Sequence, residues 1–161
     1  ECYYVLSGGP VFPLSAFWAG AVIKGGRNQG GSGITGVEFL AEHGTCREDL
    51  PQPMNFRVDR SPEKTQNAAL HVISEYEDLD AGDMDAIFTR IVLDIPITVG
   101  IPAWGHEVLI TFLVEESGLI LPGIDNSWNT DWGTNGRGLL RGRMARFDEA
   151  GAIRAVTPSA T

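Results

Sequence analysis

The chain has 161 residues, and its 12 basic against 21 acidic side chains give a formal net charge of -9. An acidic chain lacks the basic face that binds phosphate backbones, so we expect no nucleic-acid partner. No apolar run approaches the roughly 18 residues of a membrane-spanning helix, so we expect no membrane insertion. The 43% hydrophobic content excludes general disorder, and the length suits one domain or two packed half-domains.

The N-terminal third predicts a helix that follows a glycine-rich loop. Residues 25–33 lack the Lys-Ser/Thr ending of a phosphate-binding loop, so we interpret them as a sharp turn. From Ile34 to His43 apolar side chains recur three or four residues apart, and Gly44 follows as a C-terminal stop. Prolines between Cys46 and Pro62 then predict an irregular crossing between two halves.

The middle of the chain predicts one more helix. Residues 70–76 fit a helix or a strand by pattern alone. A helix is expected to start at residues 81–83, with Asp83 or Gly82 as its cap, and to run to about Leu93. Its buried stripe would be Ile87, Ile91 and Val92. The acidic residues around its start do not form a calcium loop, because Thr89 stands where the bidentate glutamate would be.

Strand patterns dominate the rest of the chain. Residues 97–99 and 108–114 are rich in β-branched and aromatic side chains, and residues 119–124 form another short strand candidate. The glycine- and tryptophan-rich end is typical of hairpins. Helices first and strands later indicate an α+β fold.

A histidine and an asparagine in the C-terminal third suggest a catalytic site. His106 stands at the start of an apolar strand, twenty residues before Asn126. A β-hairpin of that span can return Asn126 beside His106, where its side-chain amide would hold one imidazole nitrogen. This is the orienting role of the third member of a Cys-His-Asn triad.

These residues lie in two motifs that resemble the papain family of cysteine peptidases. Residues 105–110 (Gly-His-Glu-Val-Leu-Ile) are similar to the histidine segment of that family. Residues 126–138 (Asn-Ser-Trp-Asn-Thr-Asp-Trp-Gly-Thr-Asn-Gly-Arg-Gly) resemble its Asn-Ser-Trp-Gly…Trp-Gly…Asn-Gly-x-Gly signature. The resemblance extends over about residues 14–156, and residues 13–16 and 24–31 look nearest to the papain-like proteins of tailed bacteriophages.

The resemblance implies a papain-like α+β fold. Its helical half would be residues 1–62, and its β-rich half, with a barrel-like sheet, would be residues 63–161. By analogy His106 would be the general base and Asn126 its orienting partner, while Trp128 and Trp132 would support them. Trp128 would shield the His–Asn hydrogen bond from water.

The sequence departs from the family in two places. Glu107 stands where the family usually has alanine, although alternation along a strand would point this side chain away from His106. The second departure is the nucleophile, because no Gln…Gly-x-Cys-Trp motif is present. Cys2 precedes Ser15 by too few residues for the family's long helix, and Cys46 matches positions of non-catalytic cysteines. Aligned from residues 14–15, the nucleophile would lie upstream of Glu1.

Two hypotheses follow. In the first, the chain belongs to a cysteine peptidase that acts on peptide or protein substrates and whose nucleophile lies upstream of Glu1, with Cys2 as the alternative nucleophile within these residues. In the second, it is a non-catalytic papain-fold module with a structural or binding role in a bacteriophage particle, where other virion proteins would be its partners. Neither hypothesis requires a metal or a cofactor, and two cysteines leave the cellular compartment open.

Overall fold

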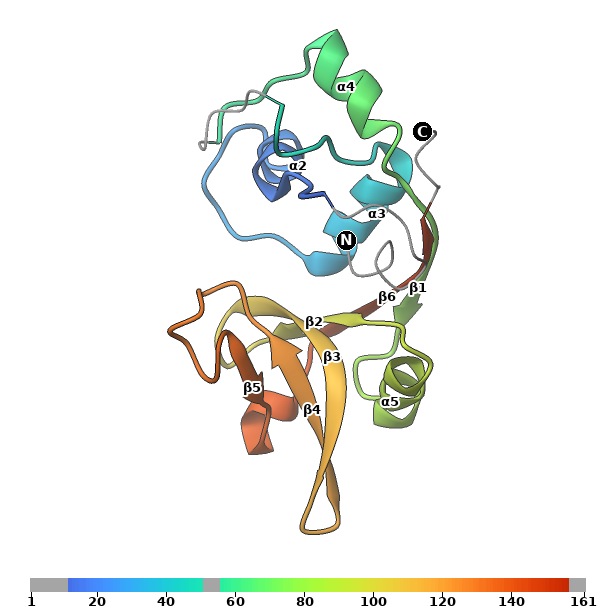
Figure 1. The fold of residues 1–161 in the computed structure, drawn as a ribbon, viewed down its shortest axis with the longest axis vertical. Coiled ribbons are helices and arrows are strands. Elements are labelled where there is room, and N and C mark those ends of the chain that lie inside the picture. The colour runs from blue at the N-terminus through green and yellow to red at the C-terminus, as the bar shows by residue number, and fades with distance from the viewer. Residues whose placement is uncertain (1–11, 51–55, 157–161) are drawn as a thin grey trace. The chain divides into compact units, whose positions relative to one another are not determined.

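The computed structural model describes residues 12–50 and 56–156 (Figure 1). The chain divides into two compact units, one formed by residues 1–76 with 153–161 and the other by residues 77–152. Helices and one antiparallel sheet make up both, which confirms the α+β fold class. No helix within the described ranges has the length and apolarity needed to cross a membrane.

The first unit contains three short helices. They are α2 (Ala16–Ile23), α3 (Gly33–Glu42) and α4 (Pro62–Ala68). The hydroxyl groups of Ser15 and Ser32 accept hydrogen bonds from the first turns of α2 and α3, as N-caps do. Five buried side chains of this unit form a small core: Trp18, Ala19, Val22, Cys46 and Ala68.

Two of these helices, α2 and α4, were not predicted from the sequence. Helix α2 is almost wholly apolar, so it has no polar face from which a helical period could be detected. Helix α4 has seven residues with almost no apolar stripe, and it begins at Pro62, a position that proline favours. The described residues between Cys46 and Ser61 are irregular, as expected, and the helix that starts at Pro62 was not predicted.

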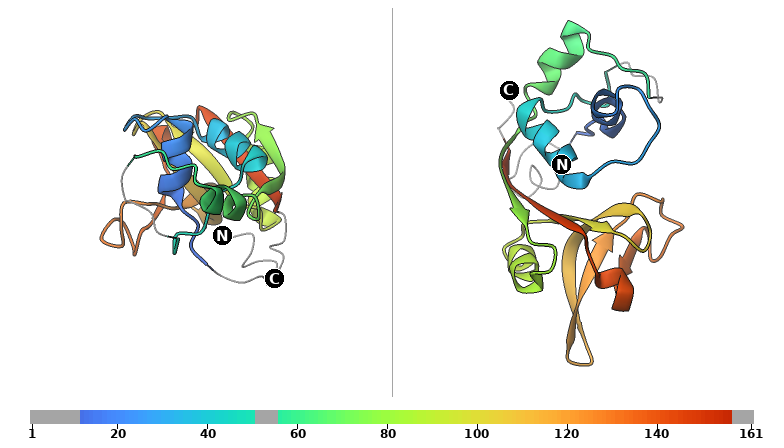
Figure 2. Two further views of the ribbon diagram at one scale, coloured as in Figure 1. Left: turned by 90° about the horizontal axis from the view of Figure 1, so that it is seen from above. Right: turned by 180° about the vertical axis from the view of Figure 1, so that it is seen from behind.

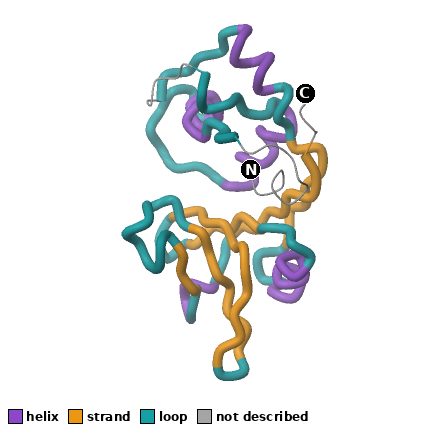
Figure 3. The backbone as a smooth tube through the Cα atoms, in the orientation of Figure 1, coloured by secondary structure: helices purple, strands orange, loops and turns teal. Residues whose placement is uncertain are grey.

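The sheet has six strands in the order β1-β6-β2-β3-β4-β5 (Figures 1 and 2). In chain order they are β1 (Ile73–Leu79), β2 (Ile97–Ile101), β3 (His106–Glu116), β4 (Leu119–Asp125), β5 (Arg137–Leu139) and β6 (Glu149–Val156). The ambiguous segment at residues 70–76 is thus strand from Ile73 onward. The long hairpin of β3 and β4 is clear in Figure 3.

Helix α5 (Met84–Val92) packs on the sheet of the second unit. Asp83, one of the two caps that the sequence offered, is its N-cap and accepts a hydrogen bond from the amide of Ala86 at 2.9 Å. Ile87 and Ile91 are buried, but Val92 is 74% exposed. The prediction for Val92 was wrong because a residue directly after Ile91 is turned about 100° around the helix.

The register of the central strands separates two faces of the sheet. Ile97, Val99 and Ile101 are buried and belong to the core with Val108 and Ile110. The alternating positions carry Thr98 and Gly100 on β2 and Glu107 on β3, on the other face. His106 and Glu107 therefore start β3 with their side chains on opposite faces.

Candidate functional site

His106 is the first residue of β3 and pairs with Ile101 of β2. The chain reaches it through a tight turn, in which the amides of Trp104 and Gly105 donate to the carbonyl of Ile101 at 3.0 and 2.9 Å. Gly105 has a φ of 57°, which glycine adopts at little cost. The turn thus fixes the position of His106 at the start of β3.

Asn126 follows the last residue of β4 and lies beside His106. Its side-chain oxygen Oδ1 is 2.9 Å from His106 Nε2. An amide oxygen only accepts, so Nε2 carries the proton and donates it. In the neutral ring Nδ1 then has a free lone pair, which is the nitrogen that could accept a proton from a nucleophile.

The loop after Asn126 is built from residues in the left-handed region of φ. Asn129, Gly133, Asn135 and Gly136 have φ values of 91°, 57°, 54° and 82°. Asparagine and glycine tolerate this conformation best, which explains the Asn- and Gly-rich motif in physical terms. The amide of Asn126 donates to the carbonyl of Gly136 at 2.9 Å, so the loop closes on the residue whose side chain is bonded to His106.

Three tryptophans form a cluster in which one, Trp128, contacts the imidazole. Trp128 stacks on His106 with ring centroids 4.7 Å apart and an interplanar angle of 21°. The ring centroids of Trp132 and Trp128 lie 6.0 Å apart in an edge-on arrangement. The ring of Trp104 lies 5.6 Å from that of Trp128 and 6.1 Å from that of Trp132. The sequence analysis assigned no role to Trp104, although its place two residues before His106 was the available signal.

Glu107 lies on the opposite face of β3 from His106. Its carboxylate oxygen Oε1 accepts a hydrogen bond from the Thr98 hydroxyl at 2.5 Å. Burial raises the pKa of Glu107 to about 7; the Thr98 bond opposes this, while Glu149 and Asp148 add to it. The departure from the family's alanine thus leaves the His106 side of the strand unobstructed.

The structure offers no accessible thiol in the described parts of the chain. Cys46 is 0% exposed and sits in the core of the first unit, as a structural cysteine does. Cys2, the candidate nucleophile, lies outside the described residues. No group of three or more His, Cys, Asp or Glu side chains suited to a metal ion is found among residues 12–50 and 56–156.

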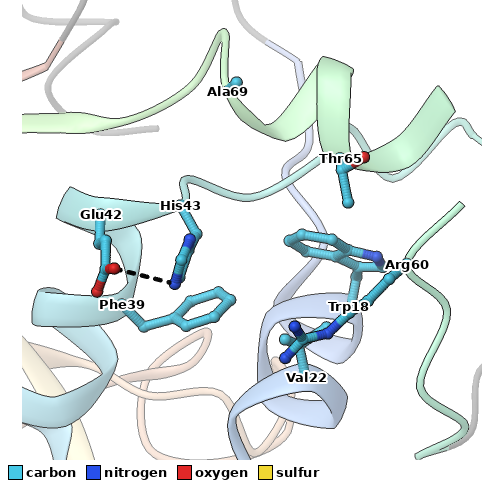
Figure 4. Close-up of a pocket in the computed structure, with 8 residues that line it drawn as sticks. All are labelled: Trp18, Val22, Phe39, Glu42, His43, Arg60, Thr65 and Ala69. Carbon is cyan, nitrogen blue, oxygen red and sulfur yellow. Dashed lines mark ion pairs between the residues drawn. The ribbon is translucent and has the colours of Figure 1, made fainter. Parts of the chain in front are cut away.

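A pocket of about 210 Å³ lies within the first unit (Figure 4). Trp18 and Val22 of α2 and Phe39 of α3 form apolar walls, and Arg60 and the His43–Glu42 pair add charge. None of the predicted site residues lines it. The pocket and the His106 site are therefore separate features of the chain.

Comparisons with solved structures show that the chain has a papain-like fold. Over 94% of this chain, procathepsin L 3 from the larval midgut of Tenebrio molitor superposes with a TM-score of 0.73 at 19% identity. The proform of the ragweed pollen allergen Amb a 11, a cysteine protease, superposes over 95% with a TM-score of 0.76 at 17% identity.

The chain spans 59% and 56% of the lengths of these two proteins. No protein-family model matches the sequence. No curated protein matches it either. The likeness therefore concerns the fold, and the chemistry must be argued from the site.

Proposed function

We propose that this chain carries the base and orienting part of a thiol-dependent peptidase centre. The observation that supports this is the hydrogen bond from His106 Nε2 to Asn126 Oδ1, with Trp128 stacked on the ring. This arrangement leaves Nδ1 free to take a proton from a cysteine thiol. The resulting thiolate would attack a peptide carbonyl, and the imidazolium would then protonate the leaving amine.

The roles follow from what each side chain contacts. His106 would act as general base and then as general acid. Asn126 would hold the ring in one tautomer and orientation, and Trp128 would limit water access to that bond. Trp132 would support Trp128 through their edge-on contact. The nucleophile would be a cysteine thiol placed next to Nδ1 of His106, with Cys2 as the alternative within these 161 residues, and the substrate would be a peptide or protein.

A peptidyl vinyl sulfone, which alkylates activated thiolates, tests this proposal on native protein. We expect one labelled cysteine, identified by peptide mapping. Because general-base catalysis contributes about 10²-fold or more, His106→Ala should slow labelling by at least about that factor. Asn126→Ala should slow it by roughly ten- to a hundredfold, the worth of a hydrogen bond to a charged group. His43→Ala, which changes an exposed histidine of the first unit, is the matched control.

Labelling that is equally fast in the His106→Ala variant would refute the proposal. The isolated 161-residue chain is expected not to hydrolyse peptides, because His106 and Asn126 offer no nucleophile. Hydrolysis that Cys2→Ser abolishes would contradict that expectation and assign the nucleophile to Cys2.

A second function is favoured by the burial of Cys46, the one cysteine within the described ranges. In this alternative the chain is a non-catalytic papain-fold module with a structural or binding role, and its proposed location is a bacteriophage particle among other virion proteins. Native material that contains the chain but takes no label on any cysteine would favour this alternative. A label that depends on His106 would exclude it.

A further inference from the structure

Three neighbouring strands bring two glutamates to either side of one glycine. Gly100 of β2 pairs with Glu107 of β3 and, on its other side, with Glu149 of β6. Directly paired residues in antiparallel strands project to the same face of the sheet. Since Gly100 has no side chain, the two carboxyl groups can meet above it.

The space above Gly100 is filled by the side chains of Glu149 and Asp148. A Cβ atom built on Gly100 would lie 2.9 Å from Glu149 Cγ and 3.3 Å from Glu149 Oε1, and it would also clash with Asp148 Oδ1. The backbone holds Asp148 there, because its amide donates to the carbonyl of Gly100 at 3.2 Å. Any larger residue at position 100 would push the carboxyl groups apart.

The groups that face Glu107 are mostly acidic. From β2 it receives the hydrogen bond of Thr98, while Glu149 of β6 and Asp148 just before it bring carboxylates. Toward β4, Asp125 is bonded to Thr111 and to Arg137. Within residues 12–50 and 56–156, Glu107 forms no ion pair with a basic side chain. Two carboxylates in such a place repel one another unless one of them holds a proton.

We propose that Glu107 is protonated in weak acid and donates its O–H to Glu149, forming a carboxyl clasp that joins β3 to β6 across Gly100 and opens as the pH rises through neutrality. Oε1 of Glu107 accepts from Thr98, so its other oxygen carries the proton toward Glu149. No cofactor or substrate takes part, and the clasp does not depend on the proposed peptidase function.

Because the pKa of Glu107 is raised in the folded chain, the clasp stabilises the fold at low pH and not at high pH. Burial raises the pKa of Glu107 from 4.5 to about 7, so between these values the folded chain binds the proton more tightly than the unfolded chain. This contribution to stability is complete below the lower value and is lost as the pH rises through about 7. Because Glu107 directly follows His106, the clasp secures the strand end from which His106 projects.

Thermal unfolding from pH 5 to pH 8.5 tests the clasp. The wild-type melting temperature should fall across this range, while that of Glu107→Gln should fall much less. The glutamine amide can donate to Glu149 and accept from Thr98, so it imitates the protonated acid at every pH. At pH 8.5 Glu107→Gln should melt about 5 °C above wild type, and Glu149→Gln should also flatten the dependence.

Glu38→Gln is the matched control, since it removes the same charge from an exposed position of α3. It should keep the wild-type pH dependence. If Glu38→Gln flattens the dependence as much as Glu107→Gln does, the effect is one of net charge and the clasp is refuted. Equal falls in wild type and Glu107→Gln refute it too.

A second measurement uses the wild-type chain alone, so it does not depend on whether a variant folds. The side-chain carboxyl ¹³C resonance of Glu107 in the wild-type chain should titrate with a midpoint near 7. A midpoint below about 5, in the range of an ordinary glutamate, would overturn the proposal.

Discussion

The indole of Trp128 lies stacked on the imidazole of His106, with ring centroids 4.7 Å apart, while Trp128 itself is 44% exposed. One face of the indole therefore contacts solvent and the other covers the ring that is bonded to Asn126. A hydrogen bond that is shielded from water is stronger than one in water. The exposed position of Trp128 is thus consistent with a shielding role.

Trp128→Ala should weaken the bond between His106 and Asn126 by about 1 kcal/mol, since water would compete for both partners. The Nε2–H proton of His106 should then exchange with solvent about fivefold faster, as measured by NMR. Trp128→Phe, which keeps a ring over the imidazole, should lie close to wild type. If exchange in Trp128→Ala is as slow as in wild type, the indole does not shield this bond.

The loop that holds Asn126 should be intolerant of substitution at Gly133. A Cβ atom there would clash with the backbone carbonyl of Arg137, and φ is 57°. Backbone cannot move aside as a flexible side chain can, so Gly133→Ala should cost about 3 kcal/mol or more of unfolding free energy.

Gly118 supplies the control for that substitution. Its φ is 77°, but a Cβ atom would meet nothing within 4 Å. Gly118→Ala should therefore cost only about 1 kcal/mol, the cost of the left-handed backbone alone. Urea unfolding measures both variants. Equal losses would mean that strain at φ, and not the contact with Arg137, governs the loop.

Gly138 should be sensitive for a different reason. A Cβ atom at this position would lie 2.7 Å from Cη2 of Trp132, which in turn contacts Trp104 and Trp128. Gly138→Ala should displace the indole and cost about 1–3 kcal/mol, as overpacking does. The emission maximum of tryptophan fluorescence should shift in the folded variant. An unchanged spectrum and unchanged stability would show that Trp132 is free to move.

Local patterns predicted the second unit better than the first. The cap at Asp83 and the buried pair Ile87 and Ile91 depend on spacing within one helix, and this spacing is visible in the sequence. Helices α2 and α4 lack it, because one is apolar all round and the other has seven mostly polar residues. Neither carries an amphipathic period, so only their packing reveals them.

In the candidate site too, features encoded by a continuous stretch of sequence were predicted, and features that depend on distant strands were not. The motif around Asn126 is continuous in sequence, and the hairpin span already indicated that it would return to His106. The placement of Glu107 and Glu149 on either side of Gly100 depends on the register of three strands, which no local pattern encodes. Trp104 was missed for a similar reason, since its partners lie in a loop more than twenty residues away.

His71 provides a pH dependence of opposite sign in the first unit. The residue is only 6% exposed, and neither ring nitrogen has a hydrogen-bond partner within the described ranges. Burial, aided by the charge of Arg47, lowers the pKa of His71 from its ordinary 6.5. The unfolded chain therefore takes up a proton before the folded chain does, and stability is lost as the pH falls below about 6.5.

His71→Leu should remove this loss, because leucine fills the buried site and has no proton to gain. Freeing the fold of an unsatisfied polar group should raise the free energy of unfolding by about 1 kcal/mol at pH 7, and by more at pH 5. Urea titrations at these two pH values measure the difference. His43→Gln, which changes the half-exposed imidazole beside Glu42, should leave the gap between the two pH values as it is in wild type. If wild type and His71→Leu lose the same stability between pH 7 and pH 5, His71 becomes protonated without opening the fold, and its burial does not set the acid limit of this unit.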